Sequence, residues 1–123
     1  MFRHKEHRLR SNRDFQMVYQ KGRFFASHLL VLYTLPQAKT TTSRLGYSIA
    51  RKTGKAILRN RVRRRLREIV HLGGSTLPLE GFDFILLARQ GAATATYREL
   101  TTDFDRVLLR FGRWHREEKK TGG

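Results

Sequence analysis

The sequence predicts an α+β fold, a two-layer sandwich in which helices pack on a four-stranded sheet. Segments near the start, in the middle and near the end repeat apolar residues at spacings of three and four, as amphipathic helices do. Short apolar runs between breaker residues indicate four strands, which gives the element order α-β-β-β-α-β-α. With 123 residues the chain suits a single domain over 1–123, and we expect residues 1–10 and 113–123 to be flexible.

The first helix is predicted through DFQMVYQ, which Ser11 or Asn12 can cap and which ends near Gly22. FFASHLLVLYTL then indicates one or two strands, and a polar loop, QAKTTTS, leads to a further strand in RLGYSIA. The last strand is FDFILLA, whose continuous apolar run indicates burial. The residues that would share one face of the first helix are Phe15, Val18 and Tyr19.

A second helix is predicted over residues 55–70 after a break at Thr53-Gly54, and a third over residues 96–112. The buried stripe of the second helix would consist of Leu58, Val62, Leu66 and Ile69. One side of the third would carry Tyr97, Leu100, Phe104, Val107, Leu108 and Phe111. The phenylalanines assigned to the core are Phe24, Phe25, Phe82, Phe84, Phe104 and Phe111.

Charge is the strongest compositional signal, because the net charge of +16 is unevenly placed. Residues 1–79 contain 18 Lys and Arg against 3 Asp and Glu, whereas residues 80–123 contain 8 against 7. A field this one-sided attracts polyanions, so nucleic acid is the favoured partner. An anionic membrane is second, since the basic segment has only a narrow apolar stripe.

Several protein classes are disfavoured by composition. The chain has no cysteine, which excludes a disulfide framework and a thiolate metal site. The longest apolar run, near LLVLYTL, is too short to span a bilayer, and the basic start lacks the apolar core of a secretory signal. We expect a soluble, cytoplasmic protein without membrane contact.

The segment LRNRVRRRLRE, residues 58–68, is unfavourable as an isolated helix, because six of its eleven residues are arginine. Like charges four positions apart destabilise a helix by a few tenths of a kcal/mol per pair. Solvated helix faces normally mix both signs, so we infer an anionic partner that removes this repulsion. Arginine also binds phosphate bidentately and stacks on bases. The basic surface of this helix comprises Lys55, Arg59, Arg61, Arg63, Arg64, Arg65 and Arg67, with Asn60 among them.

Three aromatic residues near this positive surface have two interpretations. Phe15, Tyr19 and Tyr33 can belong to the core, or they can form a platform on which unpaired bases stack. The residue pattern does not decide between these two interpretations.

The chain contains no evident catalytic constellation. Residues 1–79 offer only the carboxylates of Glu6, Asp14 and Glu68, whereas a metal-dependent nuclease needs several that converge. His4 and His7 are three apart but have no further ligand nearby in the sequence, so we expect no metal site. The chain is interpreted as a binder and not as a self-sufficient nuclease.

The stretch GKAILRNRVRRRLRE is similar to the motif of the bacterial ribonuclease P protein component. The resemblance extends over nearly the whole chain, since RLRSNRDFQMVYQKGR looks like the N-terminal helix of that family and LLVLYTL, RLGYSIARK and FDFILLAR look like its strands. The matching motif positions are Arg51-Lys52, Gly54-Lys55-Ala56, Arg59-Asn60-Arg61, Arg63-Arg64 and Arg67-Glu68.

The resemblance implies a ribonucleoprotein that removes the 5′ leader from precursor tRNA. In that family the RNA subunit carries the catalytic site with bound Mg²⁺, and no organic cofactor is expected. One small basic protein per RNA binds the RNA subunit and the single-stranded leader. The resemblance also implies that strand 45–50, helix 55–70 and strand 82–88 form a left-handed βαβ crossover, although the usual hand is right.

The resemblance assigns roles to individual residues of this sequence. Arg51 and Lys52 would lie at the edge of the leader-binding cleft. Ala50 stands where serine is common, which puts a polar leader contact there in doubt. The aromatic residues of that cleft would be Phe15, Tyr19 and Tyr33, with Tyr19 standing where phenylalanine is common. The residues expected to contact the RNA subunit are Arg59, Asn60, Arg61, Arg64 and Arg67, to which the exposed face of the same helix adds Lys55 and Arg63.

Other functions remain possible from the residues alone. A structural RNA-binding protein of the ribosomal type has the same composition, and an autonomous nuclease would show metal-dependent cleavage by the pure protein. A sequence-specific DNA binder is disfavoured, because the sequence has no helix-turn-helix or zinc pattern.

Overall fold

The predicted order of elements is confirmed by a computed structural model, which describes residue 2 and residues 5–73 and 76–121. The third helix is longer than predicted, since it continues to Thr121. Three short 3-10 turns, η1 (Lys5–His7), η2 (Arg51–Thr53) and η4 (Gln90–Ala93), were not predicted. The main elements are α1 (Asn12–Lys21), β1 (Arg23–Ala26), β2 (Leu30–Pro36), β3 (Arg44–Ile49), α2 (Ala56–Gly73), β4 (Phe82–Ala88) and α3 (Tyr97–Thr121).

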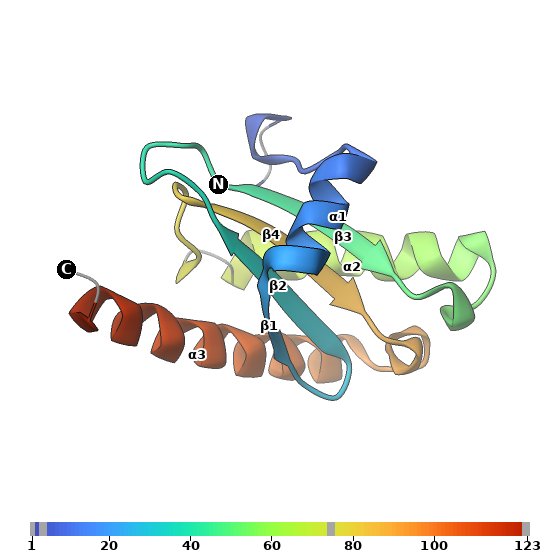
Figure 1. The fold of residues 1–123 in the computed structure, drawn as a ribbon. Helices are drawn as coiled ribbons and strands as arrows, with labels where there is room; N and C mark the ends of the chain where they lie inside the picture. Colours follow the sequence, from blue (N-terminus) through green and yellow to red (C-terminus); the bar gives the residue numbers. More distant parts are fainter. Residues whose placement is uncertain (1, 3–4, 74–75, 122–123) are drawn as a thin grey trace.

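The four strands form one sheet in the order β1-β2-β4-β3 (Figure 1). β2 pairs antiparallel with both β1 and β4, while β3 and β4 are parallel neighbours. α2 connects these two parallel strands by crossing behind the sheet when it is viewed from the side of α1. The crossover is therefore left-handed, opposite to the usual hand of such units.

Helices cover both faces of the sheet, with α1 on one face and α2 and α3 on the other (Figure 1). The larger core lies between the sheet and the pair α2 and α3, and it includes Leu66, Phe84 and Phe104, all essentially inaccessible to solvent. The smaller core, under α1, centres on Val18 and Ile85. The face that carries α1 is thus only partly covered, which leaves room there for a binding surface.

Local sequence explains how α1 begins and ends. The Ser11 hydroxyl caps the helix by accepting a hydrogen bond from the Asp14 amide at 3.1 Å. Gly22 ends it, and a Cβ at this position would lie 2.4 Å from the carbonyl oxygen of Val18 and 2.6 Å from that of Thr34. Only glycine allows the chain to turn so closely from α1 into β1.

Residues 7–9 pack against β3, the edge strand, although we expected residues 1–10 to be flexible. Leu9 is buried, and its amide donates to the carbonyl of Leu45 at 3.2 Å. The side chain of His7 is also buried, with Nδ1 2.6 Å from the carbonyl oxygen of Ser43.

Two side chains predicted to be buried are exposed. Phe24 is 60% exposed, because neighbouring residues of a strand face opposite sides and Phe25 takes the side that faces α3. Leu58 is 37% exposed, because it lies in the first turn of α2 and the buried stripe begins one turn later. The buried residues of α2 are Val62, Leu66, Ile69 and Val70.

Candidate nucleic-acid interface

Beneath α1, four residues that pair with one another in the sheet form a single row across all four strands, which we call the register row. Gly46 of β3 pairs with Ile85 of β4, Ile85 with Tyr33 of β2, and Tyr33 with Phe24 of β1. Neighbouring strands lie about 4.8 Å apart, so the side chains of these residues stand next to one another on one face. The row places two rings, those of Tyr33 and Phe24, at the open end of the sheet.

Two rings from α1 continue this row, and we call Phe15, Tyr19, Tyr33 and Phe24 the aromatic row. The ring of Phe15 lies over Gly46, and its centroid is 6.4 Å from that of Tyr19. Tyr19 meets Tyr33 edge to face at 4.8 Å, and Tyr33 meets Phe24 at 5.9 Å. Phe15, Tyr19 and Tyr33 are half-buried, so each keeps part of its ring open to solvent. These three residues therefore contribute both to the smaller core and to the surface of the protein.

The next row on this face has shorter side chains. It consists of Ser48, Leu87, Val31 and Ala26, in register across β3, β4, β2 and β1. Beyond its β3 end, η2 carries two exposed cations. These are Arg51 and Lys52, which the family resemblance predicts at the edge of the leader-binding cleft.

Tyr19 keeps its hydroxyl proton under ordinary conditions. Burial raises the pKa of Tyr19, a hydrogen bond with Ser48 lowers it, and the neighbouring Tyr33 raises it again. Because burial dominates, the ring stays neutral and imposes no charge repulsion on a phosphate backbone.

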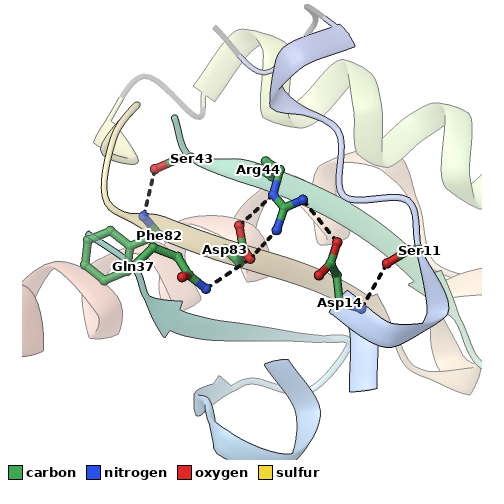
Figure 2. A network of polar contacts seen from close by, with 7 residues as sticks. All are labelled: Ser11, Asp14, Gln37, Ser43, Arg44, Phe82 and Asp83. Carbon is green, nitrogen blue, oxygen red and sulfur yellow. Dashed lines mark hydrogen bonds and ion pairs between the residues drawn. The ribbon is translucent and has the colours of Figure 1, made fainter. Parts of the chain in front are cut away.

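A polar network fastens α1 to the sheet (Figure 2). Arg44 of β3 holds the buried carboxylate of Asp83 with two donors, at 3.0 and 2.7 Å, and donates to Asp14 of α1 at 3.1 Å. Gln37 adds a donor to Asp83 at 3.2 Å. The hydrogen bond with Asp83 is the main reason why the pKa of Arg44 is raised. This network fixes the distance between α1 and β3, and with it the position of Phe15.

Residues of α2, together with Lys55 just before it, form a second surface, which we call the arginine surface. Arg61, Arg64 and Arg67 are exposed. Arg63 is half-buried and donates to the amide oxygen of Asn60 at 2.9 Å, which orients that amide. Arg59 is half-buried as well. The remaining members, Lys55 and Asn60, are exposed.

Within the described part of the chain, no arginine of α2 forms an ion pair shorter than 4 Å with a carboxylate. Arg65 differs from the others, because it is half-buried and donates to the carbonyl of Ala95 at 3.4 Å. Its guanidinium therefore lies toward the segment that precedes α3. The other arginines of α2 therefore give this helix a positive surface that no ion pair with a described carboxylate neutralises.

A groove of ≈ 600 Å³ joins the two surfaces. It lies between the N-terminal segment, β3 and α2, and Phe15 of the aromatic row lines it together with the arginine surface. Its cationic lining consists of Arg8, Arg10, Arg63, Arg64 and Arg67. The aromatic row and the arginine surface therefore form one continuous interface.

Sequence reasoning missed Arg8, Arg10, Tyr47 and Phe24 as members of this interface. The pattern Arg-Leu-Arg contained a signal, since burying Leu9 turns both neighbours outward. Tyr47 lines the groove, with the Arg67 guanidinium carbon 5.9 Å from its ring centroid. Burial raises the pKa of Tyr47 to about 12, although Arg67 acts to lower it.

The described residues contain no group of three or more His, Asp or Glu side chains arranged to hold a metal ion. Asp83 and Asp103 are buried, but each already accepts several hydrogen bonds. Of the histidine pair considered as a metal site, His4 lies outside the described residues. In the part of the chain that the structure covers, no helix is both long and apolar enough to cross a membrane.

Comparison with known proteins finds similarity over most of the chain. The family model described as "Ribonuclease P" matches residues 3–112. The ribonuclease P protein component of Exiguobacterium sibiricum is 35% identical, over 94% of this chain and 98% of that relative. The corresponding protein of Gluconacetobacter diazotrophicus is 38% identical, over 86% of this chain and 91% of that relative.

Solved structures agree with this result. An RNase P protein mutant of Staphylococcus aureus, described as defective in mRNA degradation activity, superposes with a TM-score of 0.77 at 33% identity, covering 88% of this chain and 90% of that one. The RNase P protein of Thermotoga maritima superposes with a TM-score of 0.72 at 28% identity, covering 84% of this chain and 96% of that one. The overall fold is therefore shared with these proteins over most of each chain.

Proposed function

This chain belongs to the family of bacterial ribonuclease P protein components, and on that premise we propose that it binds two RNAs at once. The arginine surface binds the catalytic RNA subunit, with one protein for each RNA. The aromatic row, flanked by Arg51 and Lys52, binds the single-stranded 5′ leader of precursor tRNA. The enzyme to which the chain contributes removes that leader and produces the mature 5′ end of the tRNA.

One observation carries this proposal: the aromatic row and the arginine surface meet in a single cationic groove. Aromatic rings stack on unpaired bases of any sequence, each worth roughly 1–3 kcal/mol. Arginines without carboxylate partners neutralise phosphates and release their counterions. A surface that offers both properties side by side suits a junction between a single strand and a folded RNA.

We place catalysis in the RNA subunit, with Mg²⁺ bound mainly there. Three carboxylates of this chain are poorly suited to the ion, because Asp83 and Asp14 are bonded to Arg44 and Asp103 accepts from Ser27 and two backbone amides. Mg²⁺ supplies charge stabilisation in phosphoryl transfer when it is bound by the RNA. The residues of this chain bind the leader, orient it and reduce repulsion between two polyanions.

The alternative of a ribosomal-type structural protein gains no specific support. The relatives described above are ribonuclease P components, and an aromatic row is not needed to bind a folded RNA through its phosphates. Copurification with ribosomal subunits would favour that alternative.

The test is cleavage of 5′-labelled precursor tRNA at low Mg²⁺ concentration. Three samples are compared: the protein alone, a bacterial ribonuclease P RNA alone, and the two mixed. We expect the mature 5′ end to appear efficiently only in the mixture. If the protein fails to stimulate cleavage by the RNA, the proposed function is wrong. If the protein alone cleaves in a metal-dependent manner, the assignment of catalysis to the RNA subunit is wrong.

A further inference from the structure

A second pocket lies at the opposite end of the sheet from the arginine surface, where α1 turns into β1. We call it the edge pocket. It has a volume of ≈ 560 Å³ and is lined by Lys21, Gly22, Arg23, Phe24, Pro36 and Trp114. None of these residues was assigned to RNA binding by the sequence or by the resemblance.

The lining combines two cations with two aromatic rings. Lys21 and Arg23 are exposed and form no ion pair within 4 Å in the described part of the chain. The guanidinium carbon of Arg23 lies 5.1 Å from the centroid of the Trp114 ring, so charge and ring are held together. No acidic residue lines the pocket. Such a lining attracts anions and offers surfaces for stacking.

Trp114 supplies a further polar group. Its indole Nε1–H is buried and has no acceptor among the described residues. The indole N–H of a buried tryptophan usually finds a partner. This buried donor is therefore left without an acceptor in the part of the chain that the structure describes.

The edge pocket is continuous with the aromatic row through Phe24. This ring packs on Tyr33 at 5.9 Å on one side and lines the edge pocket on the other. It is also 60% exposed, more than any other ring of the row. A single strand that stacks along Phe15, Tyr19, Tyr33 and Phe24 is led toward Arg23 and Trp114.

We infer that the edge pocket binds the upstream nucleotides of a long 5′ leader, beyond those held by the aromatic row. Lys21 and Arg23 contact the phosphates, and a base stacks against the ring surface between Phe24 and Trp114. The inference rests on the proposed function and adds a dependence on leader length. An acidic peptide could use the same cations, but continuity with the aromatic row favours a nucleic-acid strand.

The test measures the affinity of the reconstituted ribonucleoprotein for two precursor tRNAs over a range of salt concentrations. One carries a leader of roughly four nucleotides and the other a leader of roughly twelve, both within the range that small single-strand sites accommodate. The variant is the double substitution K21Q/R23Q, which removes two exposed charges and leaves the core intact. The matched control is R113Q/R116Q, which removes two exposed charges from α3 outside the pocket.

The wild type is expected to bind the long leader more tightly than the short one. K21Q/R23Q should lose roughly three- to tenfold in affinity for the long leader only, and its salt slope should fall by about two units for that substrate. Equal losses for both leaders, or an equal loss in R113Q/R116Q, would overturn the inference and leave the proposed function standing. A wild-type protein that does not improve binding of either precursor would instead refute the proposed function, and the inference with it.

Discussion

The ring of Phe15 lies directly against the α-carbon of Gly46, so closely that a Cβ on Gly46 would stand 2.4 Å from Cζ of Phe15. Because Gly46 has no side chain, α1 can pack closely on the sheet and the aromatic row can form. Gly46 therefore contributes to the proposed RNA surface as much as the rings themselves.

We expect Gly46→Ala to displace Phe15, to lower the free energy of unfolding by about 1–3 kcal/mol, and to weaken leader binding. Urea unfolding and affinity for a leader-bearing precursor measure the two effects. Gly112→Ala is the control, because its new methyl group would meet only the flexible end of Arg116, at 3.4 Å. That helical substitution should be neutral or stabilising by about 0.5–1 kcal/mol; similar losses in both variants would contradict the explanation.

The network around Arg44 predicts unequal costs for its two ion pairs. Arg44→Met should destabilise the protein by about 3 kcal/mol, because the Asp83 side chain is only 4% exposed and would remain as a poorly compensated charge. Asp14→Asn should cost less than about 1 kcal/mol, since both side chains of that pair are 34% exposed. The double variant Arg44→Met/Asp83→Asn should recover part of the loss. Denaturant unfolding measures the free energy of unfolding of the three variants. Equal losses of stability in the two single variants would contradict this prediction.

The arginines of α2 should separate into two classes. Arg61→Ala should weaken binding of the ribonuclease P RNA and reduce the salt slope by about one unit, because Arg61 is exposed. Arg65→Ala should leave the slope unchanged, since this guanidinium donates to the Ala95 carbonyl. Filter binding at several salt concentrations distinguishes the two. Loss of slope in Arg65→Ala would show that this residue also reaches the RNA.

Two neighbouring phenylalanines should respond in opposite ways. Phe24→Ala should change stability by less than about 1 kcal/mol and reduce leader affinity by about 1–3 kcal/mol, because the ring is exposed in the aromatic row. Phe25→Ala should destabilise the fold by about 3 kcal/mol, since its ring packs on Phe111 and Trp114. Thermal unfolding and leader binding, measured on both variants, give the comparison. A strongly destabilised Phe24→Ala would mean that Phe24 belongs to the core after all.

The pH dependence of stability should report on Tyr47. Its pKa is raised from 10.0 to about 12 in the folded protein, so the unfolded chain releases this proton first. The stabilising contribution is complete below pH 10 and is lost between pH 10 and about 12. From roughly pH 8 to pH 11, the free energy of unfolding of Tyr47→Phe should therefore rise relative to wild type by about 1–3 kcal/mol. A constant difference between the two proteins across this range would contradict the raised pKa.

Local patterns predicted most of the fold. Ser11 or Asn12 marked the start of α1 and Gly22 its end, and the apolar runs indicated the four strands. The end of α3 was misplaced even though a signal existed, since Trp114 and His115 continue the apolar side of Phe111 at spacings of three and four. The hand of the crossover came only from the resemblance, because hydrophobic patterns do not encode it.

The site was less accessible to prediction than the fold. Arg44 lies 30 positions from Asp14 and 39 from Asp83, so no local pattern could pair them. Phe24 and Phe25 are adjacent residues of the same type. Only the register of β1 on β2 decides which of them faces the solvent. Pairings of this kind depend on the folded sheet and cannot be read from spacing.

The order of strands also determines when during synthesis the aromatic row can be completed. β4 is the last strand to leave the ribosome, yet it lies between the β1–β2 hairpin and β3 and supplies Ile85, the only link between Tyr33 and Gly46 in the register row. A nascent chain that stops before Phe82 already carries every arginine of α2 but has no continuous sheet. The basic helix is thus available early, whereas the surface proposed to bind the leader exists only after β4 has been synthesised.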